Sequence, residues 1–178
     1  DQYLVSPSIQ LPAAQDLRFW HWYDLEDGFD GGVVEISTDN GANWSDLGPQ
    51  LTSNGYSGTI GGASITPLAG RSAFTGDSGG WIETHANLSS FAGQTINLRF
   101  RQADDESEAA TGWWIDDIEV GTIPVWSPIA TTAAGTTSLS WIPPATPATY
   151  CLRIRAQAAG YTTSDYSAVR SFTLLGSN

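Results

Sequence analysis

The sequence predicts an all-β protein, with a jelly-roll β-sandwich in residues 1–121 and a small partial β-sandwich segment in residues 122–178. Short runs of alternating apolar and polar residues recur along the chain, and Gly, Pro, Asn and Asp, which favour turns, separate them. Helical periodicity is nearly absent. Of the 178 residues 40% are hydrophobic, including eight Trp, so the chain is long and apolar enough to bury a sizeable core.

Seven runs predict the strands of the sandwich: residues 3–5, 17–24, 33–38, 57–60, 81–87, 95–102 and 113–120. In the second run, side chains alternate between a face with Leu17, Phe19, His21 and Tyr23 and a face with Arg18, Trp20, Trp22 and Asp24. In the run 95–102, Ile96, Leu98 and Phe100 alternate with Asn97, Arg99 and Arg101. This pattern predicts a strand with its apolar side chains inward and its Arg side chains outward.

The composition changes at Gly121, where acidic residues nearly vanish and Pro, Thr and Ala become frequent. Residues 138–141, 149–158 and 166–174 predict three further strands. They resemble pieces of a fibronectin type III domain: Leu139–Trp141 before two prolines, then alternation at Tyr150, Leu152, Ile154 and Ala156, then residues 164–167. The segment is shorter than the roughly 100 residues of such a sandwich, so we expect a partial module.

The charge of the chain is strongly acidic, at −12, and its seven basic residues are all Arg. Such a surface repels phosphate, so nucleic acid and anionic membranes are poor partners, and no apolar run is long enough for membrane insertion. Cys151 is the only cysteine, which excludes an internal disulfide framework. Metal ions can stabilise such a protein instead.

Residues 37–44 match the pattern S-x-D-x-G-x-x-W of an Asp-box, formed by Ser37, Asp39, Gly41 and Trp44. The Asn-Gly pair at 40–41 supplies the left-handed conformations of a tight hairpin turn. We expect Asp39 to accept hydrogen bonds from backbone N–H groups across the turn and Trp44 to fold back over the strands. The motif is therefore interpreted as a structural hairpin clasp.

Several strings in residues 3–120 together resemble a known bacterial module: LVSPSIQLP, EDGFDGG, the Asp-box, FTGDSGGW and GWWIDDIEV, in this order. The chain resembles the MAM-like jelly-roll of immune-inhibitor-A-type secreted metalloproteases and of bacterial surface proteins. The resemblance implies a non-catalytic, calcium-stabilised accessory module, extracellular and either secreted or at the cell surface. Its partners would be other domains of the parent chain. Members of this family usually carry a further strand before LVSP, which suggests a fragment or a sheet edge completed by another segment.

Acidic residues predict a structural Ca²⁺ site, because Ca²⁺ binds six to eight carboxylate, carbonyl and water oxygens. The candidate ligands are Asp24, Glu26, Asp27 and Asp30 in the loop DLEDGFDGG, together with Asp116 and Asp117. Gly28, Gly31 and Gly32 would let the loop backbone turn its carbonyls toward an ion. Two consecutive Asp residues should place one carboxylate inward in either register. The acidic run 104–108 is expected to be a solvated turn instead. Zinc is disfavoured, because His21 and His85 form no ligand pair.

Residues 76–80 spell GDSGG, the nucleophile signature of trypsin-like proteases, with Ser78 as the nucleophile. The sequence around His21 does not match the pattern of a trypsin-like catalytic His, and residue 81 is Trp where the signature continues with Pro. The chain also contains no H-E-x-x-H motif. The chain is therefore predicted not to be an enzyme, although it could be a piece of a secreted peptidase whose catalytic domain lies elsewhere.

The alternative function is carbohydrate binding through surface Trp residues. Trp20 and Trp22 lie on one strand face, about 6.5–7 Å apart, and would form a platform for sugar rings that Trp113 could extend. A neutral polysaccharide, or a cell-surface protein, is then a partner. In the opposing interpretation a second sheet, or the Pro-rich segment with Trp126, covers these rings.

Overall fold

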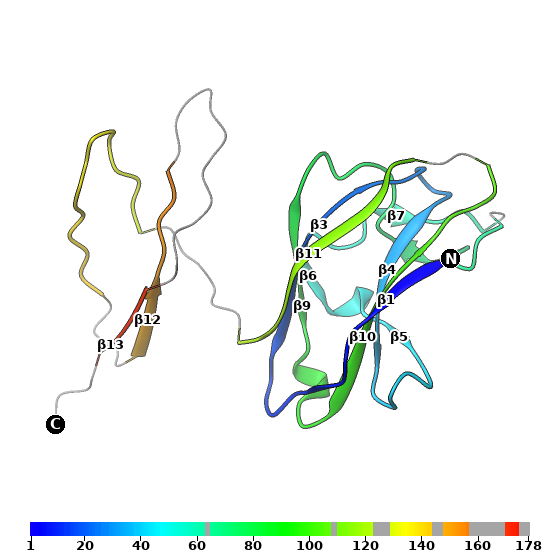
Figure 1. The fold of residues 1–178 in the computed structure, drawn as a ribbon, viewed down its shortest axis with the longest axis horizontal. Helices are drawn as coiled ribbons and strands as arrows, with labels where there is room; N and C mark the ends of the chain where they lie inside the picture. The colour runs from blue at the N-terminus through cyan, green and yellow to red at the C-terminus, as the bar shows by residue number, and fades with distance from the viewer. Residues whose placement is uncertain (63–64, 108–109, 123–128, 144–147, 157–169, 175–178) are drawn as a thin grey trace. The chain divides into compact units, whose positions relative to one another are not determined.

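The chain divides into two compact units, Asp1–Ile123 and Pro124–Asn178 (Figure 1). The computed structural model describes residues 1–62, 65–107, 110–122, 129–143, 148–156 and 170–174. Among these residues, no helix is long and apolar enough to cross a membrane.

The first unit is a sandwich of two antiparallel sheets, which confirms the predicted all-β fold. One sheet has the order β1-β10-β4-β5, with β2 also paired to β10; its strands are β1 (Gln2–Val5), β2 (Ile9–Gln10), β4 (Gly31–Ser37), β5 (Ser45–Asp46) and β10 (Thr95–Ala103). The other has the order β11-β3-β9-β6; its strands are β3 (Asp16–Asp24), β6 (Leu51–Ser53), β9 (Ile82–Asn87) and β11 (Gly112–Gly121). Consecutive long strands such as β3 and β4, or β10 and β11, lie in different sheets, as in a jelly roll.

Short elements complete this unit. A small hairpin pairs β7 (Gly58–Thr59) with β8 (Ser72–Ala73), and two 3₁₀ turns, η1 (Gly48–Gln50) and η2 (Ser89–Phe91), lie in the connections. Every run that the sequence analysis assigned to the sandwich overlaps one of the observed strands. Strands β2, β5, β6 and β8 were not predicted, because strands of two or three residues are too short to show alternation.

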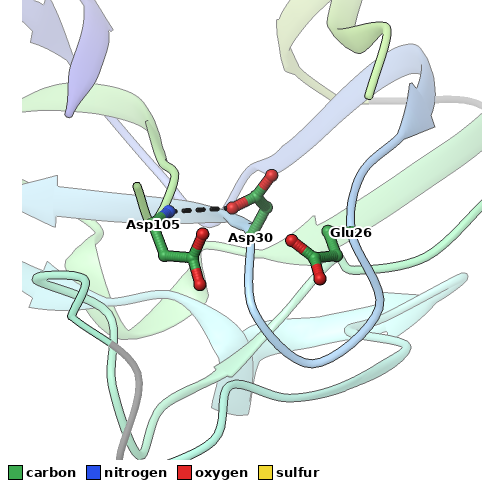
Figure 2. Close-up of side chains that lie close together, drawn as sticks. All are labelled: Glu26, Asp30 and Asp105. Atoms are coloured by element: carbon green, nitrogen blue, oxygen red, sulfur yellow. Dashed lines mark hydrogen bonds between the residues drawn. The ribbon is translucent and has the colours of Figure 1, made fainter. Parts of the chain in front are cut away.

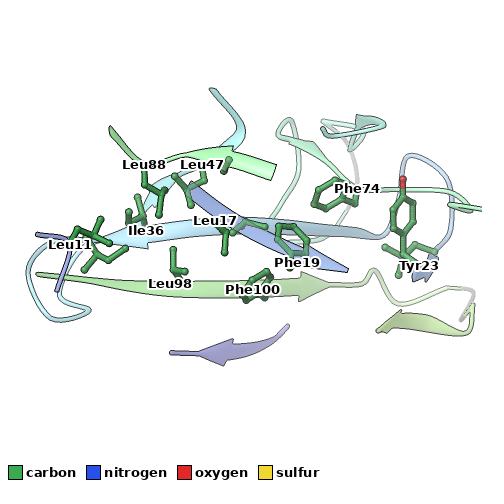
Figure 3. Packing of buried hydrophobic residues seen from close by; sticks show 14 residues of the cluster. Leu11, Leu17, Phe19, Tyr23, Ile36, Leu47, Phe74, Leu88, Leu98 and Phe100 are labelled. Carbon is green, nitrogen blue, oxygen red and sulfur yellow. The ribbon is translucent and has the colours of Figure 1, made fainter. Parts of the chain in front are cut away.

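The core lies between the two sheets and uses the faces that alternation predicted (Figure 3). Along β3, every second side chain from Leu17 to Tyr23 is buried, while those between them are partly exposed. From the facing sheet, β10 contributes Ile96, Leu98 and Phe100. Phe19 and Phe100 meet edge to face, with ring centroids 5.0 Å apart.

Strand β4 is buried on both faces, since the chain between β6 and β9 covers its outer side. A Cβ on Gly31 would lie 2.8 Å from an Ile60 side-chain carbon, and one on Gly32 would lie 2.6 Å from the Trp113 ring. Both glycines therefore permit close packing within β4, and the prediction that they turn carbonyls toward an ion is wrong. Gly28, with φ +75°, is the glycine that shapes the preceding loop.

In the second unit, β12 (Ala148–Leu152) and β13 (Arg170–Leu174) form an antiparallel pair. The strand predicted at Leu139–Trp141 is wrong: that stretch is irregular, and Leu139 is 54% exposed. No described strand pairs with it, so its backbone has no ladder to join. The predicted positions 164–167 and Trp126 lie outside the described residues.

Candidate functional site

Three carboxylates converge at one end of the sandwich, where β10 ends and β4 begins (Figure 2). The antiparallel register pairs Ala103 with Gly31, so the residue just before β4 lies beside those just after β10. This places Asp30 next to Asp105. Glu26, from the loop after β3, completes the group, and one oxygen of each carboxylate lies within 4.8 Å of the others.

Backbone hydrogen bonds hold the loop that carries Glu26 and Asp30. The Asp30 N–H donates to the Glu26 carbonyl at 2.9 Å, and the Gly28 N–H donates to Thr75 Oγ1 at 2.9 Å. Asp30 Oδ1 in turn accepts from the Asp105 N–H at 2.9 Å. Asp105 Oδ1 accepts from the Ser107 N–H at 2.8 Å, which closes a turn after β10. The two loops are thus tied together through the acidic group.

The electrostatics of the group favour a cation. Asp30 is only 2% exposed, and its burial raises the pKa of its carboxyl, as do the nearby charges of Asp104 and Asp105. The Arg residues of this unit are engaged elsewhere: Arg18 with Glu83 and Glu119, Arg71 with Glu35 and Asp46, Arg99 with Glu35, and Arg101 with Asp1. His85 lies against Glu83, and His21 is in the core. Carboxylate oxygens gathered in this way are chemistry that suits Ca²⁺ or Mg²⁺.

A cleft opens beside the group. Its acidic lining residues are Asp30, Asp104, Asp105 and Glu106, and Trp113 and Trp114 line it as well. The described lining residues include no Arg or His. The cleft therefore combines aromatic surface with hydrogen-bond acceptors.

The structure brings only two of the predicted loop ligands, Glu26 and Asp30, into the group. Asp24 accepts a hydrogen bond from Thr111 Oγ1, and Asp27 Oδ1 lies 3.5 Å from the point where a Cβ on Gly76 would stand. Asp105, which we expected in a solvated turn, is the third member. Asp105 could have been identified from strand pairing, because the strand that begins near residue 31 pairs with the strand that ends near residue 103.

The prediction that Asp116 or Asp117 faces inward is wrong, because both are exposed. A β-bulge explains this: Asp116 pairs with Trp20 and Glu119 with Arg18, so β11 has one extra residue here. Asp117 lies in this bulge with a left-handed backbone conformation, φ +50°, and its N–H donates to Asp116 Oδ1 at 2.8 Å. Strict alternation fails across the bulge, and neither residue joins the acidic group.

Side-chain to backbone hydrogen bonds organise the hairpin at residues 37–44. The Gly41 N–H donates to Ser37 Oγ at 2.8 Å, and the Asn43 N–H donates to Asp39 Oδ1 at 2.8 Å. Hydrogen bonds, mainly from the Asn43 side chain, lower the pKa of Asp39 to about 2. Trp44 lies over the Arg99 guanidinium, 4.4 Å from carbon to ring centroid. These contacts give the motif a structural role.

Ser78 of the GDSGG string is also held by backbone groups. Its hydroxyl accepts from the Tyr23 N–H at 3.1 Å and lies 2.8 Å from the Gly80 carbonyl, to which it donates. His21 Nε2 is engaged with Thr84 Oγ1 at 2.8 Å. The serine therefore connects its loop to β3 and is not paired with a general base.

Of the aromatic residues predicted to bind sugars, Trp113 points into the core. It pairs with Tyr23 on the buried face of β3, and its Nε1–H donates to His21 Nδ1 at 3.0 Å. Its neighbour Trp114 faces the other way and pairs with Trp22. These two rings stack at 4.6 Å between centroids and 17° between planes. Trp20 and Trp22 are both half-buried on the outer face of β3.

Comparisons with known proteins agree with this architecture. The family model for the immune inhibitor A-like MAM domain matches residues 4–136. The chain is similar to Bacillopeptidase F of Bacillus subtilis (strain 168), with 30% identity over 117 residues, which is 65% of this chain and 6% of that protein. It is also similar to the pre-pro-metalloprotease PrtV of Vibrio cholerae serotype O1 (strain M66-2), with 28% identity over 118 residues, which is 65% of this chain and 11% of that protein. The chain thus spans a small part of these relatives, and it belongs to the immune inhibitor A-like MAM domain family.

Proposed function

We propose that the chain is a non-catalytic, calcium-stabilised accessory module of a larger extracellular protein of the secreted peptidase type. Its membership of the family and its similarity to a short stretch of two proteins named as proteases support the accessory role. The structural part played by Ser78 supports the absence of catalysis. The other domains of the parent chain are the first expected partners.

One observation carries the calcium proposal: Asp30 is buried within a group of three carboxylates whose oxygens lie within 4.8 Å of one another. Carboxylates this close repel one another, and burial adds a desolvation cost to the charge of Asp30. A bound Ca²⁺ would remove both penalties and join the loops after β3 and β10. The remaining ligands would be carbonyl groups and water.

Thermal unfolding with saturating Ca²⁺ and with a chelator tests the proposal. At a thousandfold excess over Kd, Ca²⁺ adds about 4 kcal/mol to the free energy of unfolding. For a unit of this size this corresponds to a rise in Tm of roughly 15 °C. Coincident melting curves would refute the calcium proposal.

Two variants locate the ion. Asp30→Asn removes a buried charge, so it should melt no earlier than the wild type in chelator, yet it should lose the increment in Ca²⁺. Asp116→Asn is the matched control, because Asp116 is exposed on the bulge and should retain the full increment. If Asp116→Asn loses the increment and Asp30→Asn keeps it, the ion binds at the bulge and the assignment to Asp30 is wrong.

A second candidate function is carbohydrate binding. The observation that favours it is the exposure of large indole rings on the outer face of the β11-β3-β9-β6 sheet, with Trp81 50% and Trp114 38% exposed. Indole faces stack on the apolar faces of sugar rings. Retardation of the protein in native gels that contain neutral polysaccharide tests this candidate, and unchanged mobility in every such gel would refute it.

A further inference from the structure

A row of three tryptophans lies at one end of strands β11, β3 and β9: Trp114 within β11, Trp22 within β3, and Trp81 just before β9. Trp114 of β11 is the register partner of Trp22 of β3. On the other side of β3, His21 pairs with Ile82, the first residue of β9, and Trp81 directly precedes it. The register with β3 shifts by two residues beyond this point, since the Ser78 N–H, and not a group of Gly80, meets the Tyr23 carbonyl at 2.9 Å.

All three side chains of this row, Trp81, Trp22 and Trp114, belong to the outer face of the sheet. Their neighbours in sequence, Ile82, Tyr23 and Trp113, pack in or against the core. The stack of Trp22 on Trp114 covers one face of each ring. The other face of Trp114 lies toward the edge of the sheet, because no further strand pairs with β11 among the described residues. Trp81 and Trp114 are therefore the two rings most available to a ligand, and Trp22 orients Trp114.

The charges around the row determine which class of ligand can bind there. Beside it lie Glu83 and Asp116, the register partners of Trp20. The basic side chain on this face, Arg18, is engaged with Glu83 and Glu119. A net charge of −12 repels anionic ligands and opposes association of two copies through this face. A neutral ligand rich in hydroxyl groups fits, because its hydroxyls can donate to the carboxylates while its ring faces stack on indole.

We infer that the row formed by Trp81, Trp22 and Trp114 is the binding site for a neutral polysaccharide, with Trp81 and Trp114 each stacking on a sugar ring. This inference rests on the second candidate function and names its site and ligand class. Strand β3 lies between β11 and β9, so two strand spacings, about 10 Å, separate the backbone of Trp114 from the start of β9, which Trp81 precedes. Two or more linked sugars can span that distance, and a monosaccharide cannot contact both rings.

Affinity electrophoresis of the full chain tests the inference, with hydroxyethylcellulose, barley β-glucan and glucomannan as neutral probes and polygalacturonate as an anionic probe. We expect retardation by at least one neutral probe and none by polygalacturonate. Trp81→Ala and Trp114→Ala should each weaken binding by about three- to tenfold, the range expected for one aromatic contact. Tyr3→Ala is the control, since Tyr3 is 63% exposed on the other sheet, and it should bind like the wild type.

The outcomes separate the inference from the function on which it rests. Failure of every neutral probe to retard the wild type refutes carbohydrate binding and the inference with it. Retardation that neither Trp variant weakens leaves carbohydrate binding in place and overturns the assignment to this row. If the wild type self-associates in sedimentation experiments and Trp114→Ala abolishes this association, the row is instead an interface between copies of the chain. If Trp114→Ala unfolds, the Trp114→Tyr variant replaces it in the binding measurement. Protection of Trp81 from N-bromosuccinimide by the bound polysaccharide then tests whether this row binds the polysaccharide.

Discussion

The buried histidine of the core predicts how the stability of this domain depends on pH. His21 is fully buried, with its ring 4.6 Å from that of Phe74 and 4.9 Å from that of Phe19 between centroids. Trp113 Nε1–H donates to its Nδ1, so Nδ1 carries no proton, and Nε2–H donates to Thr84 Oγ1. The Thr84 hydroxyl then donates to the Asn54 carbonyl at 2.7 Å. The neutral imidazole thus satisfies both of its nitrogens.

A second proton on His21 has no acceptor. It would add to Nδ1, where Trp113 already directs an N–H, and it would place a charge among aromatic rings. Burial accordingly lowers the pKa of His21 from 6.5 to about 4. Between these values the unfolded chain binds the proton and the folded chain does not, so stability is complete above pH 6.5 and falls as the pH drops to 4. The 2.5 units between these pKa values correspond to about 3 kcal/mol lost across this window.

Urea unfolding at a series of pH values, in chelator so that metal binding stays constant, measures this loss. The His21→Gln variant should be less stable than the wild type at neutral pH, but its stability should change less between pH 6.5 and 4. Trp113→Phe removes the N–H that opposes protonation and should raise the pKa of His21, which NMR titration of the ring reports. A wild type and a His21→Gln variant with the same slope in this window would refute the reasoning.

Three further substitutions have expected outcomes. Gly32→Ala should cost about 1–3 kcal/mol, because its Cβ would lie 2.6 Å from the Trp113 ring, and a fully stable variant in urea unfolding would contradict the packing argument. Glu35→Gln should lower the free energy of unfolding by about 2–4 kcal/mol, since Glu35 is 4% exposed and forms ion pairs with both Arg71 and Arg99. A smaller loss in the Arg99→Met background would measure the coupling between Glu35 and Arg99. Ser78→Ala should cost about 1 kcal/mol, while a fluorophosphonate probe labels neither protein; labelling of Ser78 would show that it is a nucleophile.

Alternation along single strands made much of the sandwich predictable. The inward face of β3 and that of β10 follow from the period of two, because one side of each sheet packs on a common core. Where the period breaks, prediction failed. Asp116 shares the outward face of Trp114, and the extra residue at Asp117 leaves the second carboxylate exposed as well; such a bulge depends on pairing with β3 that a local pattern does not encode.

The acidic group shows a different limit. Glu26 and Asp30 share a loop rich in acids and glycines, so composition was enough to indicate them. Asp105 is 75 positions from Asp30 in the chain, and only the pairing of β10 with β4 brings it there. The glycines before β4 were misassigned for a similar reason, because contacts of Gly31 and Gly32 come from Ile60 and Trp113, which are distant in sequence.

Adjacent residues on β3 and β11 have opposite roles, so effects on stability and effects on ligand binding can be distinguished by substitution. Trp113 and His21 point inward, where a hydrogen bond joins them and the Trp113 ring contacts Phe100 of the facing sheet. Trp114 and Trp22 point outward from the same two strands and contact each other. Replacement of an inward ring removes core packing and a hydrogen bond, whereas replacement of Trp114 removes one stacking partner from an exposed face. Because each inward ring and its outward neighbour are adjacent in sequence, paired substitutions at 113 and 114 distinguish a loss of fold from a loss of binding on the same stretch of backbone.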